Sequence, residues 1–173
     1  MNNQFVVYLI KTLKILLAIT LAIFLVRSFV LEPGRVNGRS MEKTMIDEDL
    51  FFVNKFTLLF LKPQRGQIVQ FIEPENKTLT IKRIIGLPGE TINIKQNHIY
   101  ITPRNGTEFR LEEPYLTNNI HTEAVGIFSA NSLVVKENEY FVLGDNRTQS
   151  KDSRYYGTIN RAFILGLVVP TNN

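Results

Sequence analysis

The sequence predicts a mainly β protein, in which a single N-terminal transmembrane helix is followed by an antiparallel β-sheet domain. Three observations support this fold class. An apolar stretch occupies residues 5–31, and short β-branched and aromatic runs separated by turn residues follow it. The chain has 173 residues, 44% of them hydrophobic, which suffices for one membrane segment and one compact domain. We therefore expect an anchor at residues 1–31 and a β-rich domain at residues 32–173.

The apolar stretch is long enough to cross a bilayer. At about 1.5 Å per residue, a helix over residues 5–31 exceeds the roughly 30 Å of a hydrocarbon core. Its uncharged part, residues 15–26, is too short alone. A spanning helix therefore needs Lys11 and Lys14 to extend their charged ends to one interface and Arg27 to extend its own to the other.

Two other interpretations of this stretch compete with an anchor. A cleaved secretory signal carries small residues at −3 and −1 before the cut, and residues 27–40 contain no such site. A helix that lies on the membrane surface is amphipathic, whereas residues 15–26 are apolar on all sides. We expect an uncleaved anchor. Because basic residues stand on both sides of the apolar core, their count does not orient it.

The rest of the chain has the pattern of an antiparallel sheet. Glu32-Pro33-Gly34 is predicted to stop the helix. Apolar and polar residues alternate over residues 91–101, as in the two strands of a β-hairpin with one buried face, and the turn is expected at Gln96-Asn97. Strands are predicted at residues 50–56, 67–72, 78–85, 91–95, 98–102, 132–136, 140–143 and 162–169.

Charge and composition exclude several function classes. The net charge is only +4 and the basic residues form no run of five, so nucleic-acid binding has no support. The chain has no cysteine and two histidines, His98 and His121. Disulfides and the usual zinc sites are therefore not expected, and we predict no metal and no cofactor.

Lys82 is placed to serve as a catalytic base. Without a useful histidine, a hydrolase can use a lysine whose burial disfavours the ammonium form and lowers its pKa. A strand period of two puts Lys82 on one sheet face with Thr80 and Ile84, and sends Arg83 to the other. The ordinary alternative is a strand-edge lysine with its amine in water.

Two polar segments offer partners for such a base. Ser40, preceded by Gly38, lies in an expected exposed turn, where it is either a nucleophile or an ordinary loop serine or helix N-cap. Residues 144–157, GDNRTQSKDSRYYG, gather many short polar groups after a predicted strand. Ordinary explanations of this cluster are an Asx turn at Asp145 and a surface ion pair at Asp152.

Four segments, in order along the chain, resemble the characteristic boxes of type I signal peptidases. They are a Ser-Met box at residues 38–45, an Arg-Gly box at 65–71, KRIIGLPGE at 82–90 and GDNRTQSKDSRYYG at 144–157. Because connecting segments also look like the family's, the resemblance covers nearly the whole chain. It implies a catalytic domain of signal-peptidase type at residues 32–173.

The resemblance implies a role for each matching residue. Ser40 is the nucleophile, Lys82 is the general base, and Ser150 orients the lysine amine. Met41 shapes the substrate cleft. Apart from the resemblance, Val36, Met41 and the apolar residues of 51–61 are candidates for contact with substrate or lipid, and ordinary core packing is the alternative. Four residues of the last box are expected to hold its loop: Asp145, Arg147, Asp152 and Arg154.

The chain departs from the family pattern at several positions. Gly38 stands where some members have a serine that stabilises the oxyanion, so backbone groups must do this here. Lys43 replaces a proline after the Ser-Met pair, which changes the backbone and adds a charge near the expected cleft. Gln67 and Glu90 replace aspartates and are assigned no chemistry.

The function implied by the resemblance is removal of signal peptides from exported preproteins, with the bilayer as the second partner. The expected location is the bacterial cytoplasmic membrane, single-pass, with the catalytic domain on the extracytoplasmic side. Two alternatives stay open: a specialised processing peptidase of the same family, favoured by Lys43, and an inactive membrane-anchored β binding module. The oligomeric state is not predicted.

Overall fold

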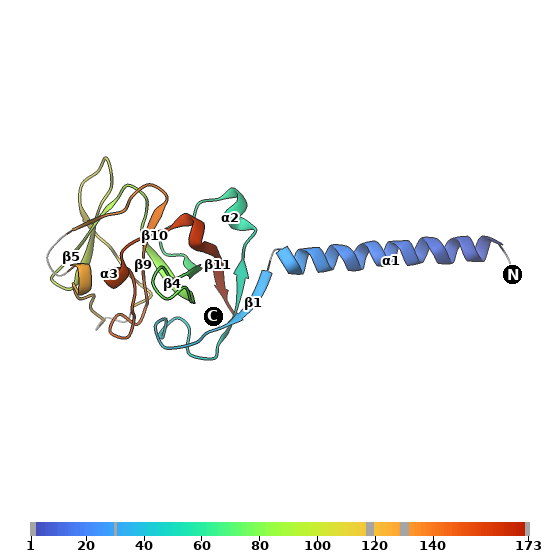
Figure 1. Cartoon of the computed structure of the whole chain (residues 1–173), viewed down its shortest axis with the longest axis horizontal. Helices are drawn as coiled ribbons and strands as arrows, with labels where there is room; N and C mark the ends of the chain where they lie inside the picture. The colour runs from blue at the N-terminus through green and yellow to red at the C-terminus, as the bar shows by residue number, and fades with distance from the viewer. Residues whose placement is uncertain (1–2, 30, 117–119, 129–131, 172–173) are drawn as a thin grey trace.

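The structure is a computed structural model that describes residues 3–29, 31–116, 120–128 and 132–171. Its first element is α1 (Asn3–Phe29), which projects from one end of the β domain (Figure 1). Within α1, the span Gln4–Leu25 is long and apolar enough to cross a membrane by length and composition, and none of it is buried against the rest of the chain. Residues 1, 2 and 30 of the expected anchor lie outside the described residues.

The chain enters the β domain through a strand that was not predicted. The helix does end before Glu32-Pro33-Gly34, but this segment belongs to β1 (Leu31–Arg35), which pairs with β2 (Leu50–Asn54). Proline is tolerated there because β1 is an edge strand of the sheet. The apolar helix α1 therefore continues almost directly into the sheet.

The larger sheet has seven described strands in the order β1-β2-β11-β3-β4-β9-β10, all antiparallel neighbours. Its remaining strands are β3 (Ile68–Ile72), β4 (Leu79–Gly86), β9 (Glu139–Leu143), β10 (Ile159–Asn160) and β11 (Ile164–Pro170). The predicted strand at 162–169 starts late because Arg161–Phe163 forms a 3-10 turn, capped by the side chain of Asn160.

The smaller sheet has the order β7-β6-β5-β8. Gln96 and Asn97 take positive φ values of 49° and 62°, the backbone of a two-residue hairpin turn, as predicted. β7 and β10, each two residues long, were not predicted, and β8 is shorter than the predicted strand at residues 132–136. Two residues are too few to show an alternating pattern in the sequence. The strands of this sheet are β5 (Thr91–Lys95), β6 (His98–Thr102), β7 (Phe109–Arg110) and β8 (Leu133–Val134).

Two short helices complete the described domain, α2 (Thr57–Phe60) and α3 (Ser153–Tyr156). The buried apolar side chains form three clusters. One joins the two sheets, one lies within the larger sheet, and one packs the turn after β1 against it. The last cluster consists of Val36, Met41, Met45, Phe51, Val53, Ile68 and Val168. Since this turn carries Ser40, its packing positions the candidate nucleophile.

Candidate active site

Ser40 and Lys82, 42 residues apart in the sequence, meet in the structure. Lys82 lies in β4, and its Nζ donates a hydrogen bond to Ser40 Oγ at 2.6 Å. Ser40 lies in the turn between β1 and β2. A hydroxyl and an amine at this distance can exchange a proton directly.

The environment of Lys82 favours the neutral amine. The residue is only 3% exposed. Burial lowers the pKa of its amine to about 8, against a smaller opposite effect of the carboxylates of Asp152, Glu73 and Asp145. The ordinary alternative, an edge lysine with its amine in water, therefore does not describe this residue. Near neutral pH, a usable fraction of the amine carries no proton.

The last box holds the main chain of the candidate nucleophile. The N–H of Asn146 donates to the carbonyl of Ser40 at 3.0 Å, and the Asn146 side-chain amide donates to Glu42 at 3.1 Å. Within the described residues, the N–H of Ser40 itself donates no hydrogen bond. This N–H is therefore free to bind an oxyanion that forms beside Ser40 Oγ.

Ser150 lies next to the dyad. Its Oγ is buried and has no hydrogen-bond partner among the described residues. It packs against Gly144 so closely that a Cβ added to Gly144 would overlap Ser150 Oγ and the carbonyl oxygen of Ser40, and would lie 2.6 Å from Ser150 Cβ. The hydrogen bond expected from Ser150 to the lysine amine is not formed in this structure, so the orienting role stays a prediction.

This close packing makes a Gly144→Ala substitution informative. We expect the added methyl to push the Ser40 main chain away from Lys82 and to lower kcat by about tenfold or more, since small misplacements of reacting groups have effects of this size. Gly106→Ala is the matched control, because its Cβ would meet only the ring of Pro103, at 3.2 Å. Equal activity in the two variants would show that the contact does not position Ser40.

A buried ion pair ties the site together. Arg83, which follows Lys82, donates to both carboxylate oxygens of Asp145, at 2.9 and 2.5 Å. Thr44, in the turn after Ser40, donates to the same carboxylate, and Arg83 donates to Thr44 at 3.1 Å. The Arg83 guanidinium also stacks on Tyr115, 3.9 Å from the ring centroid. This network joins β4, the nucleophile turn and the last box.

No role was assigned to Arg83 or Tyr115 from the sequence. The role of Arg83 could have been predicted from the sequence. Strand alternation puts Arg83 between Ile81 and Ile85 on one face of the sheet, and an arginine buried on such a face requires an acidic partner.

Three further charged residues of the last box, Arg147, Asp152 and Arg154, are also buried and paired. Arg154 donates to both oxygens of Asp152 at 2.8 and 2.9 Å, and Asp152 accepts from the Gly144 N–H at 3.1 Å. Arg147 donates to Glu113 at 3.2 and 2.5 Å. The surface ion pair considered for Asp152 is therefore a buried one. Glu113, the partner of Arg147, was not identified from the sequence.

An open groove of about 380 Å³ contains the dyad. Val36 lines it, although its side chain is only 2% exposed, whereas Met41 is completely buried in the cluster beneath the nucleophile turn. Met41 thus offers no surface to a peptide here and supports the groove from below. The groove is lined by Glu32, Pro33, Arg35, Val36, Asn37, Ser40, Phe51, Gln70, Leu79, Thr80, Ile81 and Lys82.

Lys43 and Gly38 have unusual backbone conformations. The φ angle of Lys43 is +98°, which proline, locked near −65°, cannot adopt. The turn after Ser40 therefore follows a path that the family's proline would not permit. Gly38 has φ of +95° and open space around its Cα, so a side chain there would meet backbone strain rather than a clash.

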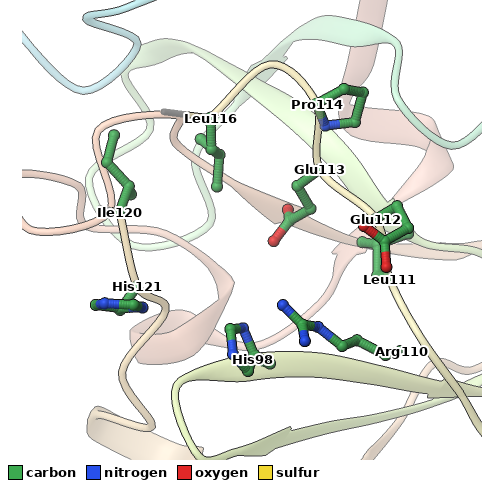
Figure 2. A pocket seen from close by; sticks show the side chains of 9 residues that line it. All are labelled: His98, Arg110, Leu111, Glu112, Glu113, Pro114, Leu116, Ile120 and His121. Carbon is green, nitrogen blue, oxygen red and sulfur yellow. The ribbon is translucent and has the colours of Figure 1, made fainter. Parts of the chain in front are cut away.

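A second cavity, of about 330 Å³, lies outside the groove and behind the Arg147–Glu113 pair. Figure 2 shows the Glu113 carboxylate pointing into it, with His98 and Arg110 on the opposite side. The rings of His98 and His121 meet edge to face, with centroids 6.1 Å apart. Among the described residues, no cluster of three or more His, Asp or Glu side chains is arranged to hold a metal ion.

The fold and the site define a hydrolase-like arrangement: a serine hydroxyl beside a desolvated amine in an open groove of an antiparallel β domain. A family model described as "Signal peptidase, peptidase S26" matches residues 9–171. The chain therefore belongs to the signal peptidase family, peptidase S26.

Individual relatives agree with this family. The chain is 40% identical over 144 residues to Signal peptidase I P of Bacillus subtilis subsp. natto, covering 81% of this chain and 74% of that one. It is 39% identical over 157 residues to Signal peptidase I of Bacillus licheniformis, covering 88% and 81%. A crystal structure of a signal peptidase I from Enterococcus faecalis V583 matches with a TM-score of 0.52 and 36% identity, over 63% of this chain and 98% of that one.

Proposed function

We propose that this chain is a membrane-anchored serine endopeptidase that removes N-terminal signal peptides from exported preproteins. Ser40 is the nucleophile and Lys82 the general base. The observation that carries the proposal is the 2.6 Å contact between Lys82 Nζ and Ser40 Oγ, with the amine buried and its pKa lowered.

The reaction follows from this geometry in two halves. Neutral Lys82 accepts the proton of Ser40 as Oγ attacks the scissile carbonyl carbon, and the oxyanion is stabilised by the Ser40 N–H. The tetrahedral intermediate expels the amine of the mature protein, which takes the proton back from Lys82 and leaves the signal peptide esterified to Ser40. Water then attacks the ester with Lys82 again accepting a proton, and Lys82 returns this proton to Ser40 Oγ as the ester bond breaks, so that the released signal peptide carries the new carboxylate and the dyad is restored.

Two strand edges support an extended substrate in the groove. β1 is an edge strand, and Leu79–Lys82 of β4 pair with β3 on one side but with no described strand on the other. Residues of both segments line the groove. A peptide in β conformation can hydrogen-bond to such edges, and the small residues expected at −3 and −1 suit shallow apolar subsites.

The anchor supports the location. The proposed anchor, residues 1–31, contains α1 and holds the catalytic domain, residues 32–173, at the membrane surface, where signal peptides emerge from translocation. We place the protein in the bacterial cytoplasmic membrane with this domain on the extracytoplasmic side. The bilayer and the preprotein are its partners.

The test is cleavage of a preprotein with an Ala-x-Ala site by the full-length protein in detergent across pH 6–10. Because the neutral amine is the active form, we expect kcat/KM to rise with pH and to reach half its plateau near pH 8, the pKa of Lys82. A preprotein whose Ala-x-Ala site is changed to Leu-x-Leu is the control and should stay uncut. An inert protein, or a rate that is flat below pH 8, would contradict the proposal.

A further inference from the structure

Glu73 is a buried carboxylate near the candidate dyad that has no part in the reaction described above. It directly follows β3 and is only 7% exposed. A glutamate is rarely buried to this extent unless a cation pairs with its charge. Within the described residues, the Glu73 carboxylate accepts one hydrogen bond, of 3.3 Å, from the Asn76 side chain and forms no ion pair.

The strand register puts Glu73 on the same sheet face as Lys82. β3 and β4 pair antiparallel, with Val69 opposite Lys82. Paired residues of neighbouring strands share a face, and so do alternate residues of one strand, here Val69, Phe71 and Glu73. The Glu73 N–H donates to the Thr78 carbonyl at 2.9 Å, so the ladder between the two segments continues past the end of β3.

Tyr156, in α3, helps to close this face off from water. It packs against the apolar cluster on the face, and its hydroxyl is buried without a hydrogen-bond partner among the described residues. Burial raises the pKa of Tyr156, and the carboxylates of Asp152 and Glu73 raise it further, so the group stays a neutral phenol. In such surroundings, charges interact more strongly than they do in water.

The charges that face Lys82 differ in how far they are already compensated. Burial lowers the pKa of Lys82, and the carboxylates of Asp152, Glu73 and Asp145 oppose this effect in that order. Asp152 and Asp145 are each bonded to a buried arginine, which opposes most of their field. Among the described residues, Glu73 is therefore the carboxylate whose charge acts on Lys82 with the least compensation.

We propose that Glu73 is a positioning residue of the dyad, whose buried carboxylate stabilises the ammonium that Lys82 becomes each time it accepts a proton. This proton comes from Ser40 in the first half of the reaction and from water in the second. Lys82 gives it up again in both halves, and Glu73 itself exchanges no proton. The ammonium persists through each tetrahedral intermediate, so a fixed negative charge nearby lowers both barriers. The inference rests on the proposed function of Ser40 and Lys82.

The test removes the charge and follows the pH dependence of cleavage. Full-length Glu73→Gln and wild type are compared in detergent on the Ala-x-Ala preprotein across pH 6–10. We expect the pH at which kcat/KM reaches half its plateau to fall by about 0.5 unit or more, because the ammonium form of Lys82 loses a stabilising charge. The plateau itself should fall by about threefold, since a less basic amine accepts the proton less readily.

Two variants serve as controls. Glu75→Gln makes the same change two residues further along, at an exposed side chain that pairs with Lys151, and should keep the wild-type midpoint and plateau. Glu73→Asp keeps the negative charge on the same face and should restore most of the midpoint. A merely structural Glu73 would lower the rate without moving the midpoint.

Each outcome decides for or against the proposal. An unchanged midpoint in folded Glu73→Gln, or an equal shift in Glu75→Gln, overturns it while the proposed function of Ser40 and Lys82 stands. An inert wild type, or one whose rate does not depend on pH, overturns both. If Glu73→Gln does not fold, Glu73→Met takes its place, because an apolar side chain of similar length suits this buried site. Failure of both variants to fold would assign Glu73 to stability and overturn the proposal.

Discussion

Replacing Ser40 or Lys82 by alanine is expected to lower kcat for preprotein cleavage by about 10³-fold or more, because in the proposed mechanism these two residues act as a unit, one as nucleophile and one as its base. The double variant should lose no more than either single one, since removal of one partner already stops the reaction. Turnover in detergent at pH 9, where wild-type Lys82 is mostly neutral, provides the measurement. Lys136→Ala, an exposed lysine far from Ser40 in the sequence, is the control and should keep full activity.

Stability separates a catalytic Lys82 from a structural one. Its pKa falls from 10.5 to about 8 on folding, so the unfolded state binds more protons between these pH values and the folded state is destabilised below pH 8. We expect Lys82→Met to raise the free energy of unfolding at pH 7 by up to about 3 kcal/mol, a gain that shrinks as pH rises toward 10. A variant that is both inactive and less stable at pH 7 would indicate a structural lysine.

Replacing Asp145 by alanine is expected to lower the free energy of unfolding by about 3–5 kcal/mol. The carboxylate is completely buried and the Arg83 side chain is 9% exposed, so the substitution leaves a buried guanidinium without its counter-charge. Cleavage should fall as well, because Arg83 adjoins Lys82 and the same carboxylate accepts from Thr44 in the nucleophile turn.

The control for Asp145 is an exposed pair of the same type. Lys95 and Glu108 form an ion pair with side chains 50 and 36% exposed, and Glu108→Ala should leave the free energy of unfolding nearly unchanged, because solvent screens an exposed pair. Denaturant unfolding in detergent compares both variants with the wild type. Similar losses in Asp145→Ala and Glu108→Ala would mean that burial does not strengthen the Arg83 pair.

Most strands could be predicted because their residues alternate over four or more positions. All eight predicted strands are present, although their ends differ by a few residues. β1 was missed because Pro33 and Gly34 read locally as a break, and only its pairing with β2 makes that segment a strand. β7 and β10 are two residues long and owe their conformation to their neighbours.

The site residues divide in the same way. The order of four motifs and the alternation around Lys82 pointed to Ser40 and Lys82, and the structure brings these two residues into contact. The partners of the last box could not be assigned, since Arg83 and Glu113 lie 62 and 34 residues from Asp145 and Arg147. No local pattern encodes a pairing over such separations.

By itself, the sequence determined the apolar helix, the β class of the domain and the residues able to carry the chemistry, because period and composition are local properties. Only the tertiary structure decided how those residues work. The pKa of Lys82 falls because β4 is covered by other segments, and Asp145 is held by an arginine on that same strand. Burial and pairing depend on which segments, far apart in the sequence, lie side by side in the folded chain, and no local pattern of residues specifies this.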